Sequence, residues 1–165
     1  MVKIGGVRKI VIDWVYLYSK LRRFKAKSVE IESVKSEIQF LNKTFPVREF
    51  RIYNRSKKCV AISKVMSGRF EEKAYHYCVS YDLHVNAVYR HRGYAEKMLK
   101  LHLEFCQKEG FEFLIGVIRK ENEASVSLFS KLGFKIIYGP NEPVWAVREA
   151  QLYREDNMCV AVYAL

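Results

Sequence analysis

The feature that most restricts how this chain can fold is an alternating segment that ends at Val85. Aromatic and aliphatic side chains at every second position from 75 to 85 alternate there with His, Cys, Ser, Asp and His. Successive side chains of a β-strand point to opposite faces, so the pattern predicts a long strand over 74–85 with one apolar and one polar face. We regard it as the clearest element in the sequence.

A turn and a helix follow this strand directly. The turn, Arg90–Ala95, contains two arginines and a glycine, and the amphipathic helix that it opens extends to about Glu109. A helix N-terminus presents unpaired N–H groups and the positive end of the helix dipole, and Gly93 leaves room for an anion to reach them. The turn therefore predicts a phosphate-binding site, although an ordinary strand-to-helix turn with surface arginines has the same appearance. The chain has no Walker loop and no Gly-x-Gly fingerprint.

The remaining segments complete an α/β pattern. Hairpin-length polar connections predict antiparallel pairing in the first half of the chain, and the helix after 74–85 predicts that the strand beyond it is parallel. The sequence therefore predicts a mixed sheet flanked by helices. Further strands are expected at 28–32, 47–53, 59–66, 111–118, 134–138, 144–147 and 158–163, and further helices at 7–25, 33–42 (with Ser33 as N-cap) and 122–132.

Composition predicts one globular domain over 1–165, because half of the 165 residues are apolar. The net charge is +11, and residues 1–27 carry eight Lys or Arg against Asp13 alone. This basic N-terminal arm, expected to be helical, could contact nucleic acid, an anionic surface or an acidic partner, but such an arm is more often a solvated face. Both interpretations stay open, as does the choice between a monomer and a homodimer.

The sequence shows no pattern typical of a metal site, an export signal or a membrane span. The four cysteines lie nineteen or more residues apart without a Cys-x-x-Cys pair, and the apolar run 10–18 is far shorter than the ~20 residues that span a bilayer. His76 and His84 would lie about 26 Å apart on one strand, and Asp82 with His84 would supply only two ligands. We expect a reduced, cytoplasmic protein without a metal.

Two segments together resemble the GNAT superfamily of N-acetyltransferases. Residues 90–95, Arg-His-Arg-Gly-Tyr-Ala, match the family's Arg/Gln-x-x-Gly-x-Gly/Ala motif. Residues 122–134 resemble its second signature, in which an Asn precedes a small residue and the helix ends Lys-Leu-Gly-Phe. The resemblance covers about 75–137, which would be the acetyl-CoA-binding core. It implies a sheet that splays between two central parallel strands, 74–85 and 111–118.

The resemblance also implies a ligand and an activity. Acetyl-CoA would be the co-substrate, with its pyrophosphate in the turn and its pantetheine arm along the end of the long strand. The acetyl group would pass by direct attack to a primary amine, either a protein N-terminus or lysine or a small amine such as a polyamine. The residues implied in cofactor binding are Leu83, His84, Val85, Arg90, His91, Arg92, Gly93, Tyr94, Ala95, Asn122, Ser125 and Phe129, the last near the sulfur.

The sequence departs from the family where protons are exchanged. Many members have a Tyr at the position of Phe129 and a carboxylate or other base at the position of Val79 or Val117. None of the three side chains found here can exchange a proton. A non-catalytic acyl-CoA-binding module, with the basic arm holding nucleic acid or an acidic partner, is therefore the alternative to an enzyme.

Substitute proton-transfer groups lie on the long strand. Asp82 and His84 share its expected polar face about 6.6 Å apart, and His84 has the better-matched intrinsic pKa. Tyr81, with Tyr77 as an alternative, flanks Val79 on the other face and could act as an acid. We take Tyr81, Asp82 and His84 as the candidate catalytic residues.

Overall fold

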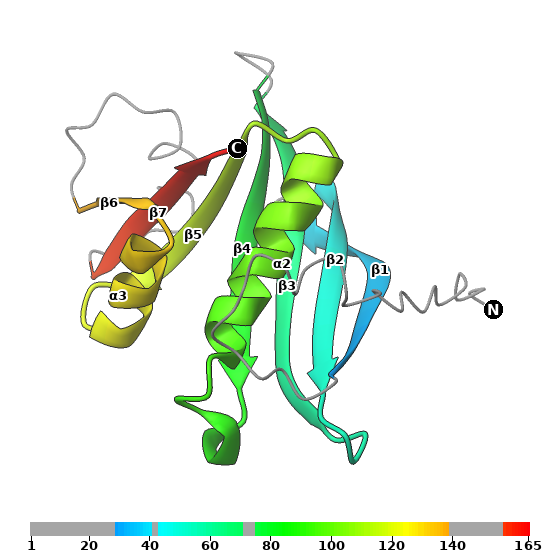
Figure 1. Cartoon of the computed structure of the whole chain (residues 1–165). Helices are drawn as coiled ribbons and strands as arrows, with labels where there is room; N and C mark the ends of the chain where they lie inside the picture. Colours follow the sequence, from blue (N-terminus) through cyan, green and yellow to red (C-terminus); the bar gives the residue numbers. More distant parts are fainter. Residues whose placement is uncertain (1–28, 41–42, 71–74, 139–156) are drawn as a thin grey trace.

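The computed structural model describes residues 29–40, 43–70, 75–138 and 157–165. In this part of the chain seven strands form one mixed sheet, ordered β1-β2-β3-β4-β5-β7-β6, with two α-helices (Figure 1). The expected helix at 7–25 and strand at 144–147 lie outside the described residues. The elements are β1 Glu30–Phe40, β2 Lys43–Tyr53, β3 Cys59–Phe70, β4 Tyr75–Val85, η1 Ala87–Tyr89, α2 Tyr94–Lys108, β5 Phe113–Arg119, α3 Glu123–Lys131, β6 Lys135–Ile137 and β7 Met158–Ala164.

The largest correction concerns β1. A helix over 33–42 was expected, but residues 30–40 form a strand that pairs with β2 without a register shift, from Glu30 opposite Tyr53 to Phe40 opposite Lys43. Val34 and Ile38 are spaced four apart, which fits one side of a helix and one face of a strand equally well. A partner strand of equal length decides between the two, and the segment alone did not reveal that partner.

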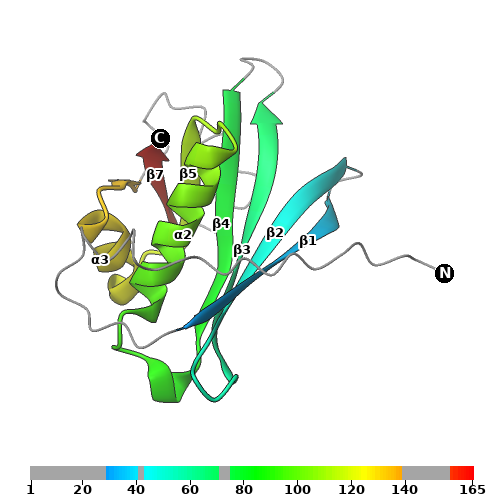
Figure 2. The ribbon, with the colours of Figure 1, turned by 45° about the vertical axis from the view of Figure 1, so that its right-hand side comes forward.

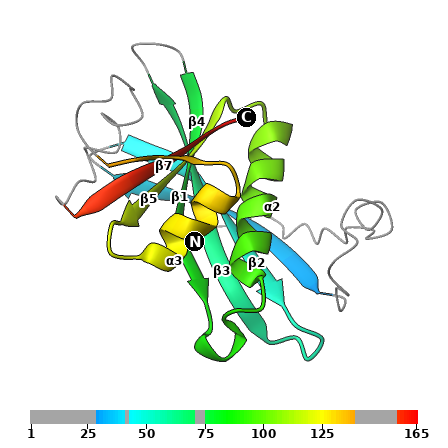
Figure 3. The same cartoon turned by 60° about the vertical axis from the view of Figure 1, so that its left-hand side comes forward.

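Two apolar clusters cover the two faces of the sheet. The cluster that includes Met98 and Leu99 of α2 also takes in Phe129 of α3, so both helices pack on the same face (Figure 3). The opposite face holds a second cluster, made entirely of strand residues, that includes Tyr77 and Val79 of β4.

β4 is buried on both faces over residues 77–80, so the expected polar face is wrong at Cys78 and Ser80, whereas His76, Asp82 and His84 are exposed as expected. Cys78 and Ser80 are buried on the α2 side, while Tyr77 and Val79 are buried on the other side. A central strand covered on both faces loses the in–out alternation of polarity that an exposed strand keeps.

β4 and β5 are parallel, as expected, and they separate after four residue pairs. Their ladder begins at Tyr77 opposite Phe113 and ends at Ser80 opposite Gly116. Beyond this rung β4 pairs with β3 alone, and β5 continues against β7. The two ribbons diverge toward the end of β4 in Figure 1. The splayed sheet predicted by the resemblance is confirmed.

A β-bulge lies immediately beyond the last rung. Ile62 of β3 faces His84 and Lys64 faces Tyr81, so Ser63 alone opposes two residues of β4. Asp82 takes the positive φ of 53° that the extra residue requires, a conformation that Asp tolerates better than most side chains. The buried Ser63 hydroxyl donates to the Tyr81 carbonyl at 3.1 Å and so stabilises the irregular backbone.

The bulge also reverses which face each side chain occupies. Tyr81 packs with the cluster away from α2, whereas Leu83 and Val85 pack with the cluster under α2. The period of two that the sequence shows over 75–85 is therefore interrupted in space, because one extra residue shifts all later side chains to the other face.

Candidate functional site

The turn after β4 presents a row of unpaired backbone donors. Among the described residues, the N–H groups of 91–96 donate to no protein acceptor, and the first helical bond runs from Lys97 N–H to the Gly93 carbonyl at 3.0 Å. His91 and Gly93 have positive φ of 57° and 80°, which curls the chain so that helix α2 begins at Tyr94. Exposed N–H groups at a helix N-terminus form a site that favours an anion.

Side chains fix the shape of this turn without covering it. The Tyr89 hydroxyl accepts from the Asn54 amide at 3.1 Å, and the Arg92 guanidinium lies over the Tyr89 ring at 5.6 Å from its centroid. Arg90 Nε donates to the Val85 carbonyl at 3.2 Å, which ties the turn to the end of β4. Residues 90–93 are exposed. The turn is therefore preorganised, and its positive charges are accessible to a ligand.

Phe129 lies against the backbone where β4 and β5 part. A Cβ built on Gly116, the last rung of β5, would come within 2.5 Å of Phe129 Cε1. The ring is 5% exposed and packs edge-on against Phe134, with centroids 4.8 Å apart. Gly116 therefore allows the ring to sit on the main chain at the start of the splay, and the ring brings no proton-exchanging group there.

Asn122 and Ser125 lie at the N-terminus of α3. Asn122 is the N-cap, and its Oδ1 accepts from the Ser125 N–H at 3.1 Å. This hydrogen bond explains why an Asn opens the helix, since a capping oxygen satisfies an otherwise unpaired N–H. Contact of the two residues with a cofactor stays a prediction.

The three candidate catalytic side chains have different surroundings. The Asp82 carboxylate is 3.0 Å from Lys64 Nζ, and this hydrogen bond raises the pKa of the lysine. Tyr81 is partly buried beside Lys64, whose Nζ lies 5.7 Å from the ring centroid; burial raises the pKa of Tyr81, against a smaller lowering by Lys64. His84 is exposed. Tyr81 therefore stays protonated at neutral pH, while the charge of Asp82 is already paired.

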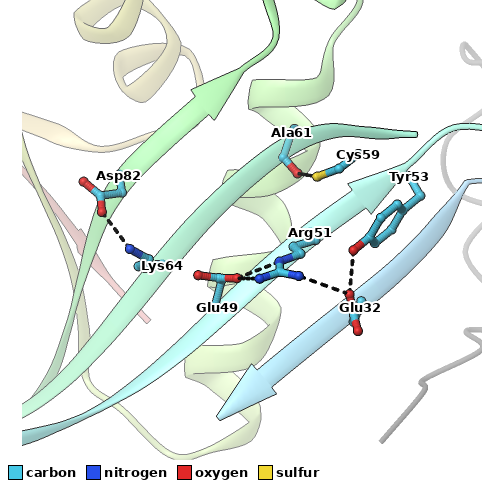
Figure 4. A network of polar contacts seen from close by, with 8 residues as sticks. All are labelled: Glu32, Glu49, Arg51, Tyr53, Cys59, Ala61, Lys64 and Asp82. Carbon is cyan, nitrogen blue, oxygen red and sulfur yellow. Dashed lines mark hydrogen bonds and ion pairs between the residues drawn. The ribbon is translucent and has the colours of Figure 1, made fainter. Parts of the chain in front are cut away.

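A separate polar network that the sequence reasoning missed joins β2 to β1, beside the Lys64–Asp82 pair (Figure 4). Arg51 binds Glu49 through Nε at 2.7 Å and Nη2 at 2.6 Å, and the Tyr53 hydroxyl donates to Glu32 at 2.7 Å. Glu49, Arg51 and Tyr53 alternate along β2, a pattern that could have indicated a shared polar face. The pairing with Glu32, which is 21 residues away from Tyr53 in sequence, carried no local signal.

A buried polar pair joins α2 to the last rung of β4, and it too was missed. Ser80 Oγ lies 3.0 Å from His102 Nδ1, and both side chains are buried. His102 Nε2 has no hydrogen-bond partner in the described part of the chain. Burial lowers the pKa of this imidazole to about 3, so it is neutral at physiological pH.

In the described part of the chain, no group of three or more His, Cys, Asp or Glu side chains could hold a metal ion. None of the helices found there is both long and apolar enough to cross a membrane.

The comparisons with known proteins agree with this geometry. The sequence profile of the acetyltransferase (GNAT) family matches residues 14–134, so the chain belongs to the GNAT family, as its two motifs predicted. A search of curated protein sequences finds no significant relative. Among solved structures, a GNAT family acetyltransferase from Elizabethkingia anophelis with acetyl-CoA bound has a TM-score of 0.54 at 13% identity, covering 72% of this chain and 76% of that chain.

Two plant structures share the fold to a similar degree. NAA60 from Arabidopsis thaliana, solved with a bisubstrate analogue, has a TM-score of 0.56 at 11% identity, covering 72% of this chain and 75% of that chain. Naa50 from the same plant, solved with the bisubstrate analogue CoA-Ac-MVNAL, has a TM-score of 0.52 at 19% identity, covering 71% and 72%. At these identities the likeness establishes the GNAT fold.

Proposed function

We propose that the chain is an N-acetyltransferase that moves the acetyl group of acetyl-CoA to a primary amine. The observation that carries this proposal is the junction at the end of β4. There the open side of a strand leads into a turn whose N–H groups, 91–96, have no acceptor in the part of the chain that the structure describes. A ligand with an amide-bearing arm and a pyrophosphate has the two chemical features that such a junction would bind.

Acetyl-CoA would be held mainly by backbone. The N–H groups of 91–96, with Arg90 and Arg92 nearby, would bind the pyrophosphate. The arm would run beside Leu83–Val85, which pair with β3 on one side only. The thioester that acetyl-CoA supplies would then lie toward the start of the splay, near Phe129 and Tyr81. Because backbone donors would hold the pyrophosphate, binding would require no particular side chain at positions 91 and 95. This explains why His91 and Ala95 are compatible with the motif.

The acceptor we favour is the amino group of a protein N-terminus or lysine. NAA60 and Naa50 were solved with bisubstrate analogues, in Naa50 one that joins CoA to a peptide, and both share this fold. A small amine such as a polyamine is the second choice. Thiol release measured with a panel of peptides and polyamines separates the two.

Tyr81 is the residue we assign to proton transfer. The neutral amine nitrogen attacks the thioester carbonyl, the C–S bond breaks, and the tyrosine proton passes to the leaving thiolate. The ammonium proton leaves through water to the exposed His84, and Tyr81 recovers its proton from solvent. Tyr81 suits this role because burial raises its pKa and keeps it protonated. Asp82 suits it less because its carboxylate is paired with Lys64.

Cofactor binding is tested with Gly93→Asp and a matched control, Gly110→Asp. Both glycines have positive φ, 80° and 76°, and they flank the two ends of α2, but only Gly93 lies in the turn. Calorimetry should show that a carboxylate in the turn weakens acetyl-CoA binding at least roughly tenfold, while the control binds as the parent does. Equal binding by both variants would show that the turn has another role.

Catalysis is tested by thiol release against peptides and polyamines. Tyr81→Phe should lower kcat by roughly 10²-fold and leave the KM for acetyl-CoA nearly unchanged. Tight acetyl-CoA binding without turnover on any amine would instead support the non-catalytic acyl-CoA-binding module. The observation that favours this module is that Phe129, Val79 and Val117 occupy the family's usual proton-transfer positions. No binding at all would contradict both functions.

A further inference from the structure

β1 leaves one long edge of the sheet without a partner strand among the described elements. It is the first strand in the sheet order and pairs only with β2 (Figure 2). Its eleven residues contain no proline, and its pairing with β2 shows no register shift. An edge strand without a bulge presents a row of outward N–H and C=O groups, here over residues 31–40, which is a template for another strand.

Geometry limits how this edge could pair with a second copy of itself. The N–H and C=O of one residue point to the same side of a strand, so outward-facing residues recur at every second position. Two copies related by a two-fold axis can then meet only in registers centred on a single residue. Those centred on Lys35 or Glu37 bring two like charges together at the axis, which destabilises a sheet.

The register centred on Ser36 avoids this repulsion and places complementary side chains of the two copies opposite one another. Lys35 then faces Glu37 of the other copy, twice by symmetry, and Val34 faces Ile38 in the same way. Registers centred on Val34 or Ile38 form no pair of opposite charges. The self-complementarity thus selects one register, as expected of an isologous interface.

The surroundings of these side chains support the same register. Lys35 faces Arg48 across the β1–β2 pair, and Arg48 lies over the Phe105 ring at 5.3 Å, so its neighbour within the sheet carries a like charge. Glu37 faces Pro46, which is uncharged. The Ile38 side chain is 38% exposed, one of few large apolar side chains so exposed in the described part of the chain. A second copy would give Lys35 a counter-ion and would cover Ile38.

We propose that two copies of this chain associate through antiparallel pairing of their β1 strands centred on Ser36, which joins the two sheets into one. One face of the junction carries the two Lys35–Glu37 pairs, and the other carries the two Val34–Ile38 pairs. The junction lies at the edge of the sheet away from β5–β7–β6, so the site at the end of β4 stays open in each copy.

A charge exchange tests the register in the full-length protein. Sedimentation velocity over low to high micromolar concentration should show a dimer. Lys35→Glu alone and Glu37→Lys alone each place like charges opposite one another, and each should raise the dimer dissociation constant roughly tenfold or more. The double variant Lys35→Glu/Glu37→Lys restores opposite charges and should recover the dimer. Glu123→Lys, on α3, makes the same charge change as Glu37→Lys and should have no effect.

Cysteine cross-linking tests the axis independently. Ser36 faces itself across the two-fold, where opposed Cα atoms lie about 4.5–5.5 Å apart, so Ser36→Cys should form an intermolecular disulfide on mild oxidation. Ile38→Cys, two residues along, is the control, because its counterpart lies about four residues away, roughly 13 Å along the strands. Both are made in a Cys59→Ser background, since Cys59 is the exposed native cysteine among the four.

Three results would overturn the proposal. The wild-type chain could be monomeric throughout the concentration range, or its dimer could be unaffected by both single charge reversals. Alternatively, Ile38→Cys could cross-link as readily as Ser36→Cys. Circular dichroism of each variant excludes unfolding as the cause of a lost dimer, and recovery by the double variant excludes it independently.

Discussion

The two halves of β4 have the same alternating sequence and opposite structural roles. Residues 77–80 are paired on both sides, to β3 and to β5, and are buried on both faces. In the described part of the chain, residues 81–85 are paired on one side only, contain a bulge, and lead to the exposed turn. Residues 77–80 hold the sheet together, and residues 81–85, which we call the open half of β4, leave main-chain groups available for a ligand.

The difference shows how the proposed acetyl-CoA site would form without special side chains. The ladder to β5 ends where Phe129 lies on Gly116, and the bulge at Asp82 bends β4 just beyond it. The turn then supplies the N–H groups of 91–96, which have no acceptor among the residues described. Each of these features leaves main-chain groups unpaired by neighbouring described strands, so the proposed site would depend more on where the strands part than on which side chains line it.

The largest expected effect on stability comes from adding a side chain at Gly116, the last β5 residue that pairs with β4. Gly116→Val introduces a Cβ within 2.5 Å of Phe129 Cε1, and we expect the free energy of unfolding to fall by about 3 kcal/mol through overpacking. Chemical denaturation measures the change. Gly116→Ala should cost less, and adding Phe129→Leu to it should recover part of the loss. A Gly116→Val protein as stable as the parent would show that the ring does not depend on this glycine.

The next largest effect concerns the paired residues of β4, where Ser80 contacts the buried His102 of α2. The folded-state pKa of His102, about 3, lies below the ordinary value of 6.5. Below pH 6.5 the unfolded state therefore binds more protons than the folded state, and the free energy of unfolding decreases as the pH is lowered. We expect His102 to account for about 2 kcal/mol of lost stability between pH 7 and pH 5. Denaturation at several pH values should show a flatter profile for His102→Gln. An unchanged profile would mean that His102 does not stay neutral in the fold.

A smaller effect tests whether the bulge needs its residue type. Asp82 has a φ of 53°, which a β-branched side chain adopts only at a cost. Asp82→Val should therefore destabilise the chain by about 1–2 kcal/mol. Asp82→Gly, which loses the same pair with Lys64 but fits the backbone, should stay within about 0.5 kcal/mol of the parent. Equal losses in both variants would assign the effect to the lost ion pair.

The smallest effect is expected for the ion pair itself. Lys64 and Asp82 are 31% and 61% exposed, so solvent screens the pair. Lys64→Met should change stability by less than about 0.5 kcal/mol, and added salt should reduce even that. Urea denaturation at low and high salt measures it. A loss several times larger would mean that this lysine supports the open half of β4 by packing on Tyr81.

The sequence predicted the features whose signals are local. Gly93 and the residues around it indicated the turn and the start of α2, and the second motif indicated α3, whose N-cap is Asn122. The features that it missed depend on partners far along the chain. The bulge requires the register with β3, the strand character of β1 required β2, and the link between Ser80 and His102 joins residues 22 positions apart.

The most direct test of the central claim is amide hydrogen exchange with and without acetyl-CoA. If the open half of β4 and its turn bind the cofactor through backbone N–H groups, saturating acetyl-CoA should slow exchange at residues 81–85 and 91–96. The β1–β2 pair should exchange as before, because it lies at the far edge of the sheet. Saturation with no slowing at these two segments, or with protection confined to other parts of the chain, would contradict the account.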